Sequence, residues 1–167
     1  MKMLLLGPKH HISGQMGGVV ISFEKLIEEL NIKKIDYIVV DINKNNYKNI
    51  FIALTSIFYK IMKNIPKISH VSLHGTVNDF IYIAPFLVLI SKISNKKISL
   101  RKFGGNFIYV YETSNFLQKK LIRYALKNSS AIFFQTKYLV NYFARFNKNT
   151  HWMPTARAQP ITTKNKQ

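Results

Sequence analysis

Cysteine is absent from this 167-residue chain, and acidic residues are scarce. Without cysteine the protein forms neither disulfides nor thiolate metal sites. Asp and Glu together number 7 against 25 Lys and Arg, which gives a formal net charge of +18 at pH 7. Such an excess favours anionic partners: nucleic acid, phosphorylated ligands or an anionic membrane surface. Lys, Ile and Asn are abundant throughout, so a compositional habit of the source is an equal explanation of the basic bias.

The sequence also lacks a long hydrophobic run. The N-terminal apolar run, residues 3–6, is too short for the core of a signal peptide. The longest run, residues 80–90, contains Pro85 and is closed by Lys92, well short of the roughly 18 residues that a membrane-spanning helix needs. We therefore expect a buried helix there.

Short aliphatic or β-branched runs alternate with longer helical patterns along nearly the whole chain. This alternation is typical of βαβ units with a parallel sheet, and the strand runs are apolar at consecutive positions, as in strands covered on both faces. The chain is long enough for one hydrophobic core and short for two. We predict an α/β fold, a Rossmann-like doubly wound parallel sheet with helices on both faces. Its strands are expected at residues 3–6, 36–40, 70–74, 98–100 and 131–135.

The segments between these runs have helical spacing. From Val19 to Leu30, apolar residues recur every three or four positions, with glutamates and Lys25 on the opposite face. Further helices are predicted at residues 48–62, at 77–93, around residues 117–125 with Thr113 or Ser114 as the cap, and around 139–146 after Thr136.

The end of the sequence changes character. A short edge strand is expected around His151 and Trp152, and from Pro154 the chain is polar and has no periodicity. We predict one Rossmann-like domain at residues 1–153, followed by a polar tail or the start of an interdomain linker at 154–167.

Three loops follow predicted strands and so belong to the edge of the sheet where ligands bind. The first contains Gly14, Gly17 and Gly18 just before a helix, where backbone N–H groups and the helix dipole favour a phosphate or an acidic group. Its sequence matches neither the dinucleotide fingerprint nor the Walker loop. The alternative is that these glycines only form a turn and allow close helix–sheet packing. His10 and His11 of the same loop have no carboxylate nearby and predict no metal site.

The second loop begins at His74, at the end of a strand and near Asp79. An imidazole in this position could orient or deprotonate a hydroxyl, although a lone histidine is equally often structural. The third loop has Arg101 and Lys102 just before Gly104, Gly105 and Asn106, a combination that suits phosphate or sugar hydroxyls. Its alternative is a tight turn with two solvated cations.

The stretches "SGQMGGVVISFEKLIEEL", "HVSLHG", "ISLRKFGGNF", "AIFFQTKYLVNYF" and "HWMPTAR" occur in the order and spacing of a known family. The chain, to about Arg157, resembles the N-terminal domain of GT-B glycosyltransferases, in particular the family 4 (group 1) enzymes of bacterial polysaccharide synthesis. In that family two Rossmann-like domains face each other, the first holding mainly the acceptor and the second mainly the nucleotide sugar.

The resemblance implies an enzyme that transfers a hexose from a nucleotide sugar to a saccharide or lipid-linked acceptor. It implies a catalytic role for His74 and substrate-binding roles for six residues: Gly17, Gly18, Arg101, Gly104, Gly105 and Asn106. No metal and no cofactor besides the nucleotide sugar are implied. It further implies a cytoplasmic protein, or one that is peripheral at the inner face of the membrane through its basic surface.

Two features depart from the family pattern. Many members have a histidine followed by glycine in the loop that here contains Arg101 and Phe103, so a catalytic histidine cannot be assigned there. The second domain, which holds the nucleotide sugar, is not in this sequence, so we expect the isolated half to be inactive. The alternatives are a basic module for an anionic membrane or nucleic acid, and a dinucleotide-binding domain supported by Asp41. Nucleic acid is disfavoured because the aromatics occupy core positions, and the dinucleotide alternative because the first loop is long.

Overall fold

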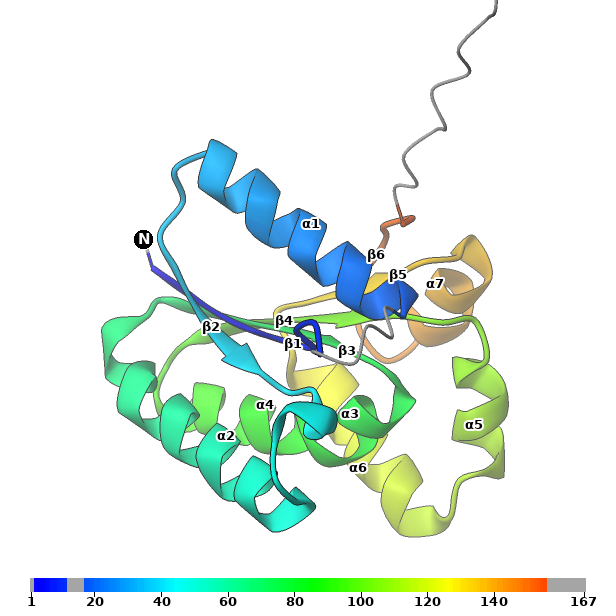
Figure 1. Cartoon of the computed structure of the whole chain (residues 1–167). Helices are drawn as coiled ribbons and strands as arrows, with labels where there is room; N and C mark the ends of the chain where they lie inside the picture. The colour runs from blue at the N-terminus through cyan, green and yellow to red at the C-terminus, as the bar shows by residue number, and fades with distance from the viewer. Residues whose placement is uncertain (1, 12–16, 156–167) are drawn as a thin grey trace, which may run out of the picture.

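The computed structural model describes residues 2–11 and 17–155. Six strands form one sheet in the order β2-β1-β3-β4-β5-β6, and every neighbouring pair is parallel (Figure 1). This arrangement confirms the predicted Rossmann-like parallel sheet. The strands are β1 (Met3–Gly7), β2 (Tyr37–Asp41), β3 (His70–Gly75), β4 (Lys97–Lys102), β5 (Ala131–Phe134) and β6 (Thr150–Trp152).

The strand order decides which face each helix covers, because crossovers between parallel strands are right-handed. The connection from β1 to β2 steps toward one edge of the sheet, and every later connection steps toward the other. Accordingly, α1 (Gly18–Ile32) lies on one face, whereas α2 (Ile50–Asn64), α4 (Ala84–Ile93) and α6 (Phe116–Asn128) lie on the opposite face (Figure 1). Helices cover both faces, as predicted.

The larger hydrophobic core lies between the sheet and this second layer of helices. An aromatic cluster occupies its centre: the ring centroid of Phe107 is 4.8 Å from that of Phe143, and the ring of Phe143 stacks on Phe134 at 5.1 Å. All three side chains are fully buried. Phe107 and Phe143 belong to the short helices α5 (Phe107–Thr113) and α7 (Lys137–Phe143), which the cluster therefore fixes to β5.

The smaller core lies under α1, where Phe23 and Leu30 pack with Leu5 of β1. The sequence pattern from Val19 to Leu30 therefore identified the correct buried face. Among the described residues, the helices other than α1 contribute their buried apolar side chains to the larger core on the opposite side.

The predicted helix at 77–93 is two helices in the structure, α3 (Val77–Tyr82) and α4. Pro85 explains the division because it lies in the first turn of α4, where a helix needs no N–H from that residue. Two short 3-10 turns, η1 (Lys44–Asn46) and η2 (Ile65–Lys67), flank α2.

Helix α5 was not predicted, and the cap of α6 is Asn115 rather than Thr113 or Ser114. The Asn115 side chain accepts a hydrogen bond from the backbone N–H of Gln118 at 2.9 Å. The Gln118 side chain accepts one from Asn115 in return, which completes a capping box. Helix α7 follows Thr136 as predicted, and β6 confirms the edge strand at His151 and Trp152. None of the helices in the described part of the chain has the length and apolarity to cross a membrane.

Candidate functional site

The carboxyl ends of the parallel strands share one edge of the sheet, and proteins of this class bind ligands there. The connection after β1 leads to α1 on one face, whereas the connection after the neighbouring strand β3 leads to the opposite face. The position between β1 and β3 is therefore the topological switch point of the sheet. His74 lies at the end of β3, directly at this point.

Helix α1 begins at Gly18, with Gly17 as its N-cap, and no side chain caps it. A methyl group placed on either glycine would meet no atom within 4 Å from the described residues beyond its own helix and chain neighbours. Close helix–sheet packing, the alternative considered for these glycines, therefore does not require them. The start of α1 favours an anionic group through its backbone N–H groups and dipole. Gly14, the remaining glycine of this loop, lies outside the described residues.

His74 is buried against α1. Its ring centroid lies 5.4 Å from that of Phe23, which belongs to the second turn of the helix. Nε2 of His74 is 2.9 Å from Oγ of Ser72, and Nδ1 is buried without a hydrogen-bond partner. Burial, with a further contribution from the positive charge of Arg101, lowers the pKa of His74 from 6.5 to about 3. The imidazole is therefore neutral near pH 7.

Arg101 is the register partner of His74 across β3 and β4. Its side chain is 6% exposed, and the guanidinium carbon lies 4.8 Å from the centre of the Phe103 ring. Neither a hydrogen bond nor an ion pair joins Arg101 to any described residue, and its Nε is buried without a partner. Burial lowers the pKa of Arg101, but a guanidinium stays charged at neutral pH. A buried cation without a counter-charge is costly, and an anionic ligand would offset that cost.

Asp79 does not serve as a partner for His74 or Arg101. Its Oδ2 accepts hydrogen bonds from the backbone N–H of Thr76 at 2.7 Å and from the Thr76 hydroxyl at 2.9 Å. The bond from the Thr76 backbone N–H is part of the capping box of α3. Burial raises the pKa of Asp79, and the bonds from Thr76 oppose that rise. The carboxylate thus stabilises the turn after β3.

The loop after β4 brings Gly104, Gly105 and Asn106 to the same edge, beyond Phe103. Gly104 has a φ of +88°, a left-handed conformation that glycine adopts without penalty. Its N–H donates to Oε1 of Gln135 at 2.8 Å, which ties the loop to the end of β5. Gly105 and Asn106 are exposed. The structure therefore leaves both within reach of a ligand at the edge.

Lys102 corrects the expectation that two cations flank this loop. It is fully buried on the opposite side of β4, with Nζ 5.2 Å from the centre of the Phe107 ring. The ammonium donates to the carbonyls of Phe103 and Gly104. Burial lowers its pKa to about 8, and the negative charge of Asp79 partly opposes this shift. Side chains alternate along a strand, so Arg101 and Lys102 could not both have faced the ligand.

A polar network not predicted from the sequence holds the first residues of the loop after β1, around Lys9. Oδ1 of Asp41, at the end of β2, accepts hydrogen bonds from the backbone N–H groups of Lys9 at 2.9 Å and Asn43 at 2.8 Å. Its Oδ2 accepts from Nδ2 of Asn46 at 2.6 Å. Asp41 is thus committed to its own loop rather than to a ribose. The signal was the Asp-x-Asn spacing after a strand, which favours Asx-type turns.

No group of three His, Asp or Glu side chains within residues 2–11 and 17–155 could hold a metal ion. Lys97, in register with His70 at the other end of β4, is exposed and lies away from the ligand edge. The predicted site residues thus belong to two groups. His74 and Arg101 are buried, and the loop positions around them, such as Gly105 and Asn106, are exposed.

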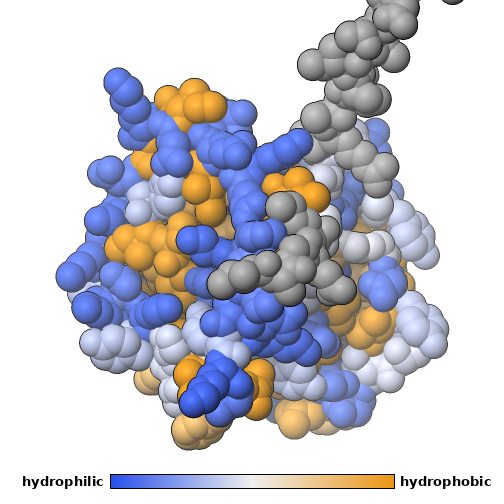
Figure 2. Space-filling model, viewed as in Figure 1, coloured by the Kyte–Doolittle hydropathy of each residue, from blue (hydrophilic) through white to orange (hydrophobic). Residues whose placement is uncertain are grey.

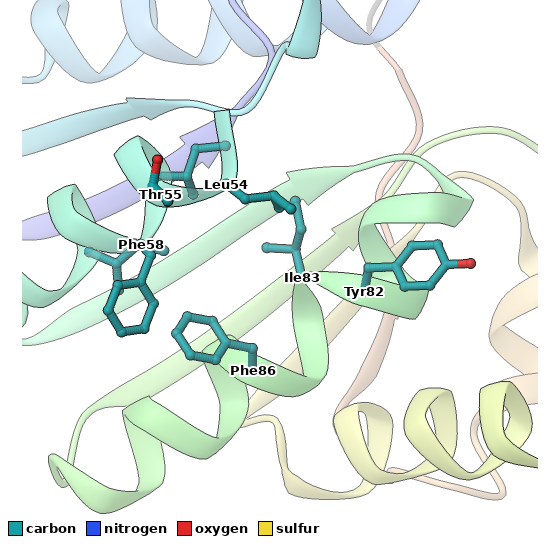
Figure 3. Close-up of a pocket in the computed structure, with 8 residues that line it drawn as sticks. Leu54, Thr55, Phe58, Tyr82, Ile83 and Phe86 are labelled. Atoms are coloured by element: carbon teal, nitrogen blue, oxygen red, sulfur yellow. The ribbon is translucent and has the colours of Figure 1, made fainter. Parts of the chain in front are cut away.

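A second surface lies between α2 and the α3–α4 pair. Figure 3 shows Phe58 and Phe86 facing each other across it, at a ring-centroid distance of 5.3 Å. This groove has a volume of about 470 Å³. Leu54 and Tyr82 also line the groove and are exposed, and Phe51 of α2 is exposed as well. In Figure 2 hydrophobic patches of this kind are interspersed with hydrophilic residues over the face shown.

Comparison with models of known protein families finds no match, and comparison with curated proteins finds none either. Among solved structures, the chain is similar to a chain described as "Crystal Structure of TesA". That similarity has a TM-score of 0.41 and 13% sequence identity, and covers 91% of this chain and 77% of the other. A likeness at this level carries no functional conclusion. The fold class rests on the strand order and the helix layers.

Proposed function

We propose that this chain is the acceptor-binding half of a glycosyltransferase that moves a hexose from a nucleotide sugar to a saccharide or lipid-linked acceptor in surface polysaccharide synthesis. The observation that supports this most is the position of Arg101 and His74. Both are buried polar side chains with unused hydrogen-bonding atoms at the ligand edge of the sheet, His74 at the switch point and Arg101 on the neighbouring strand β4. Most buried polar groups in proteins are hydrogen-bonded, so unused ones at a ligand-binding edge indicate a ligand.

Each site residue has a defined part in this proposal. Arg101 binds the acceptor, and Gly104, Gly105 and Asn106 contact its hydroxyl groups. Gly17 and Gly18 leave space for the ligand at the start of α1, where no described side chain lies within 4 Å of a Cβ on either residue. His74 orients the reacting part of the acceptor. The nucleotide sugar is bound mainly by a second domain, so we expect transfer only when both domains are present.

Sugar transfer by the intact enzyme tests this function. Extracts that contain the full gene product would be given radiolabelled nucleotide sugars and candidate lipid-linked or free saccharide acceptors. The variants are Arg101→Met and Gly18→Trp. The matched control is Arg145→Met, which removes an arginine that is 52% exposed and lies 3.7 Å from Glu112.

We expect transfer to fall about tenfold or more in Arg101→Met and Gly18→Trp, because each loses ligand contact, and to be unchanged in Arg145→Met. Wild-type-like rates in both site variants would show that this edge does not bind the substrates. Absence of transfer to any acceptor by the wild type would argue against a glycosyltransferase.

A second candidate function is attachment to an anionic membrane surface. It is favoured by the groove between α2 and the α3–α4 pair. Helix α2 has no acidic residue, and Lys60 and Lys63 flank its exposed apolar side chains, such as Phe51 and Tyr59. Asp79, which is committed to a capping box, is the sole acidic residue from 42 to 111. Lysine beside exposed aromatic and aliphatic groups is typical of helices that lie in a membrane interface.

Sedimentation with vesicles tests the second candidate. Binding to vesicles containing phosphatidylglycerol, but not to pure phosphatidylcholine, is expected to fall in Phe51→Ser and in Lys60→Gln. The charge-matched control, Lys34→Gln, removes an exposed lysine beyond the end of α1 on the opposite face of the sheet. Retention on DNA that exceeds retention on these vesicles at moderate salt would favour a nucleic-acid module instead.

A further inference from the structure

Four polar side chains form a continuous hydrogen-bonded chain along the α1-facing side of the sheet. Nε2 of His70 lies 2.9 Å from Oγ of Ser99, and this hydroxyl donates to Oγ of Ser72 at 3.0 Å. The Ser72 hydroxyl in turn lies 2.9 Å from Nε2 of His74. This series of hydrogen bonds therefore connects His70, at the start of β3, to His74 at the end of β3, next to Arg101.

A bond between two hydroxyls can run in either direction; with Ser99 as its donor, the positions of the other protons follow. Each serine hydroxyl has one proton to donate. Ser99 donates its proton to Ser72, so its oxygen accepts from Nε2–H of His70. Ser72 donates its own proton to Nε2 of His74. Because His74 is neutral, its single ring proton then lies on Nδ1. This is the nitrogen that is buried without a partner.

Two unused N–H donors thus lie on register-paired residues. One is Nδ1–H of His74 and the other is Nε–H of Arg101. Two donors of which one belongs to a cation are complementary to an oxygen that carries negative charge. Within the described residues, neither a hydrogen bond nor an ion pair joins Asp79 to His74 or Arg101, and its Oδ2 is bonded to Thr76. No ion pair links Arg101 to the acidic residues of the described chain.

We propose that His74 and Arg101 together bind one anionic oxygen group of a ligand, a phosphate or a carboxylate, and that Ser72, Ser99 and His70 are positioning residues that hold His74 in its donor tautomer. His74 is then a hydrogen-bond donor to the ligand rather than a base. The inference rests on the proposed function only where it assigns this anionic group to the acceptor. Binding of the group itself is a property of the isolated chain.

Nitrogen-15 NMR of the imidazole rings tests the tautomer directly, since a protonated ring nitrogen and a bare one have well-separated shifts. In the wild-type chain we expect His74 to have its proton on Nδ1. In Ser72→Ala and Ser99→Ala the ring is expected to populate both tautomers. The matched control is Ser91→Ala, which removes a fully buried serine of α4 outside the chain of hydrogen bonds. A wild-type His74 with its proton on Nε2 would overturn the inference.

Titration of the same chain with inorganic phosphate, and separately with glucuronate, tests the ligand class and distinguishes its two sources. Tighter binding of phosphate would indicate a phosphorylated ligand, and tighter binding of glucuronate an acidic sugar. Either probe should shift the His74 resonances, and Arg101→Met should weaken binding about tenfold or more. Ser99→Ala should weaken it less, and Ser91→Ala not at all.

Failure of both anions to shift the His74 resonances would refute the anion site. So would unchanged binding in Arg101→Met, or in Arg101→Lys if the methionine variant does not fold. Failure of the proposed function is a different result. In that case the isolated chain would bind phosphate or glucuronate through Arg101, and the intact gene product would transfer no sugar.

Discussion

A Cβ atom on Gly7 would lie 2.4 Å from the ring of Phe23. Gly7 ends β1, and Phe23 is the fully buried side chain through which α1 reaches His74. We expect Gly7→Ala to lower the free energy of unfolding by about 1–3 kcal/mol, because either the ring or the strand must shift. Urea unfolding followed by circular dichroism measures this loss.

Gly18→Ala is the control for this prediction. No atom of another described segment lies within 4 Å of a Cβ at residue 18, and alanine favours the first turn of α1. Its stability should equal or slightly exceed that of the wild type. The double variant Gly7→Ala/Phe23→Leu should recover part of the lost stability because the smaller side chain leaves room. If Gly7→Ala and Gly18→Ala unfold at the same urea concentration, the close contact does not limit stability.

The sheet could be predicted because its strands are apolar on both faces, as Leu4, Leu5 and Leu6 of β1 illustrate. The ends of helices were harder to predict, since they depend on single capping interactions. Asn115 competes with Thr113 and Ser114 as a cap, and the bond to Gln118 decides between them. Helix α5 was not predicted because it has only seven residues. Its two buried side chains, Phe107 and Tyr111, form a pattern too short for helical spacing to be recognised.

Asp41→Ala should loosen the loop that follows β1. The substitution removes the acceptor for the backbone N–H groups of Lys9 and Asn43 and for the side chain of Asn46. We expect a loss of about 1 kcal/mol, since the bonds from Lys9 and Asn46 are exposed and only the bond from Asn43 is partly buried. Hydrogen exchange at the amides of Lys9 and Asn43 should accelerate. Asp36→Ala removes the same charge from an exposed position and should leave both amides protected.

His74 should make the protein sensitive to acid. Its pKa is about 3 in the folded chain and near 6.5 when unfolded, because burial and Arg101 disfavour the imidazolium. Between these values the unfolded state binds more protons, so the free energy of unfolding falls as the pH drops from about 6.5 toward 3. The slope approaches about 1.4 kcal/mol per pH unit for this group.

His74→Gln, which cannot titrate, should lose less stability over the same pH range. The quantity to measure is the difference between wild type and variant at each pH, because the lowered pKa of His70 adds a further contribution to both proteins. Parallel curves for the two proteins between pH 6.5 and 4 would contradict a depressed pKa of His74.

The candidate site was predicted only in part, and the reason is geometric. Residues at strand ends can be placed at the ligand edge from the sequence, and this correctly grouped His74 with Arg101. Alternation along the strand separates Arg101 from Lys102 but does not say which of them faces α1, and Lys102 was grouped with Arg101 for that reason. Long-range pairings such as Gly104 with Gln135, 31 positions apart, leave no local sequence signal.

Lys102 should destabilise the protein at neutral pH and cease to do so in alkali. Burial lowers its pKa from 10.5 to about 8, with Asp79 limiting the shift. Below pH 8 the lysine is protonated in both states, and the desolvation cost is fully present. Between about 8 and 10.5 the unfolded chain binds more protons than the folded chain, so the free energy of unfolding rises with pH.

Lys102→Met removes the titrating group, and the stability of wild type relative to this variant should therefore increase from pH 7.5 to 10. Unfolding of both proteins in urea at several pH values measures that difference. A difference that stays constant with pH would mean that the Lys102 ammonium is solvated, and that the loop at Gly104 is held without it.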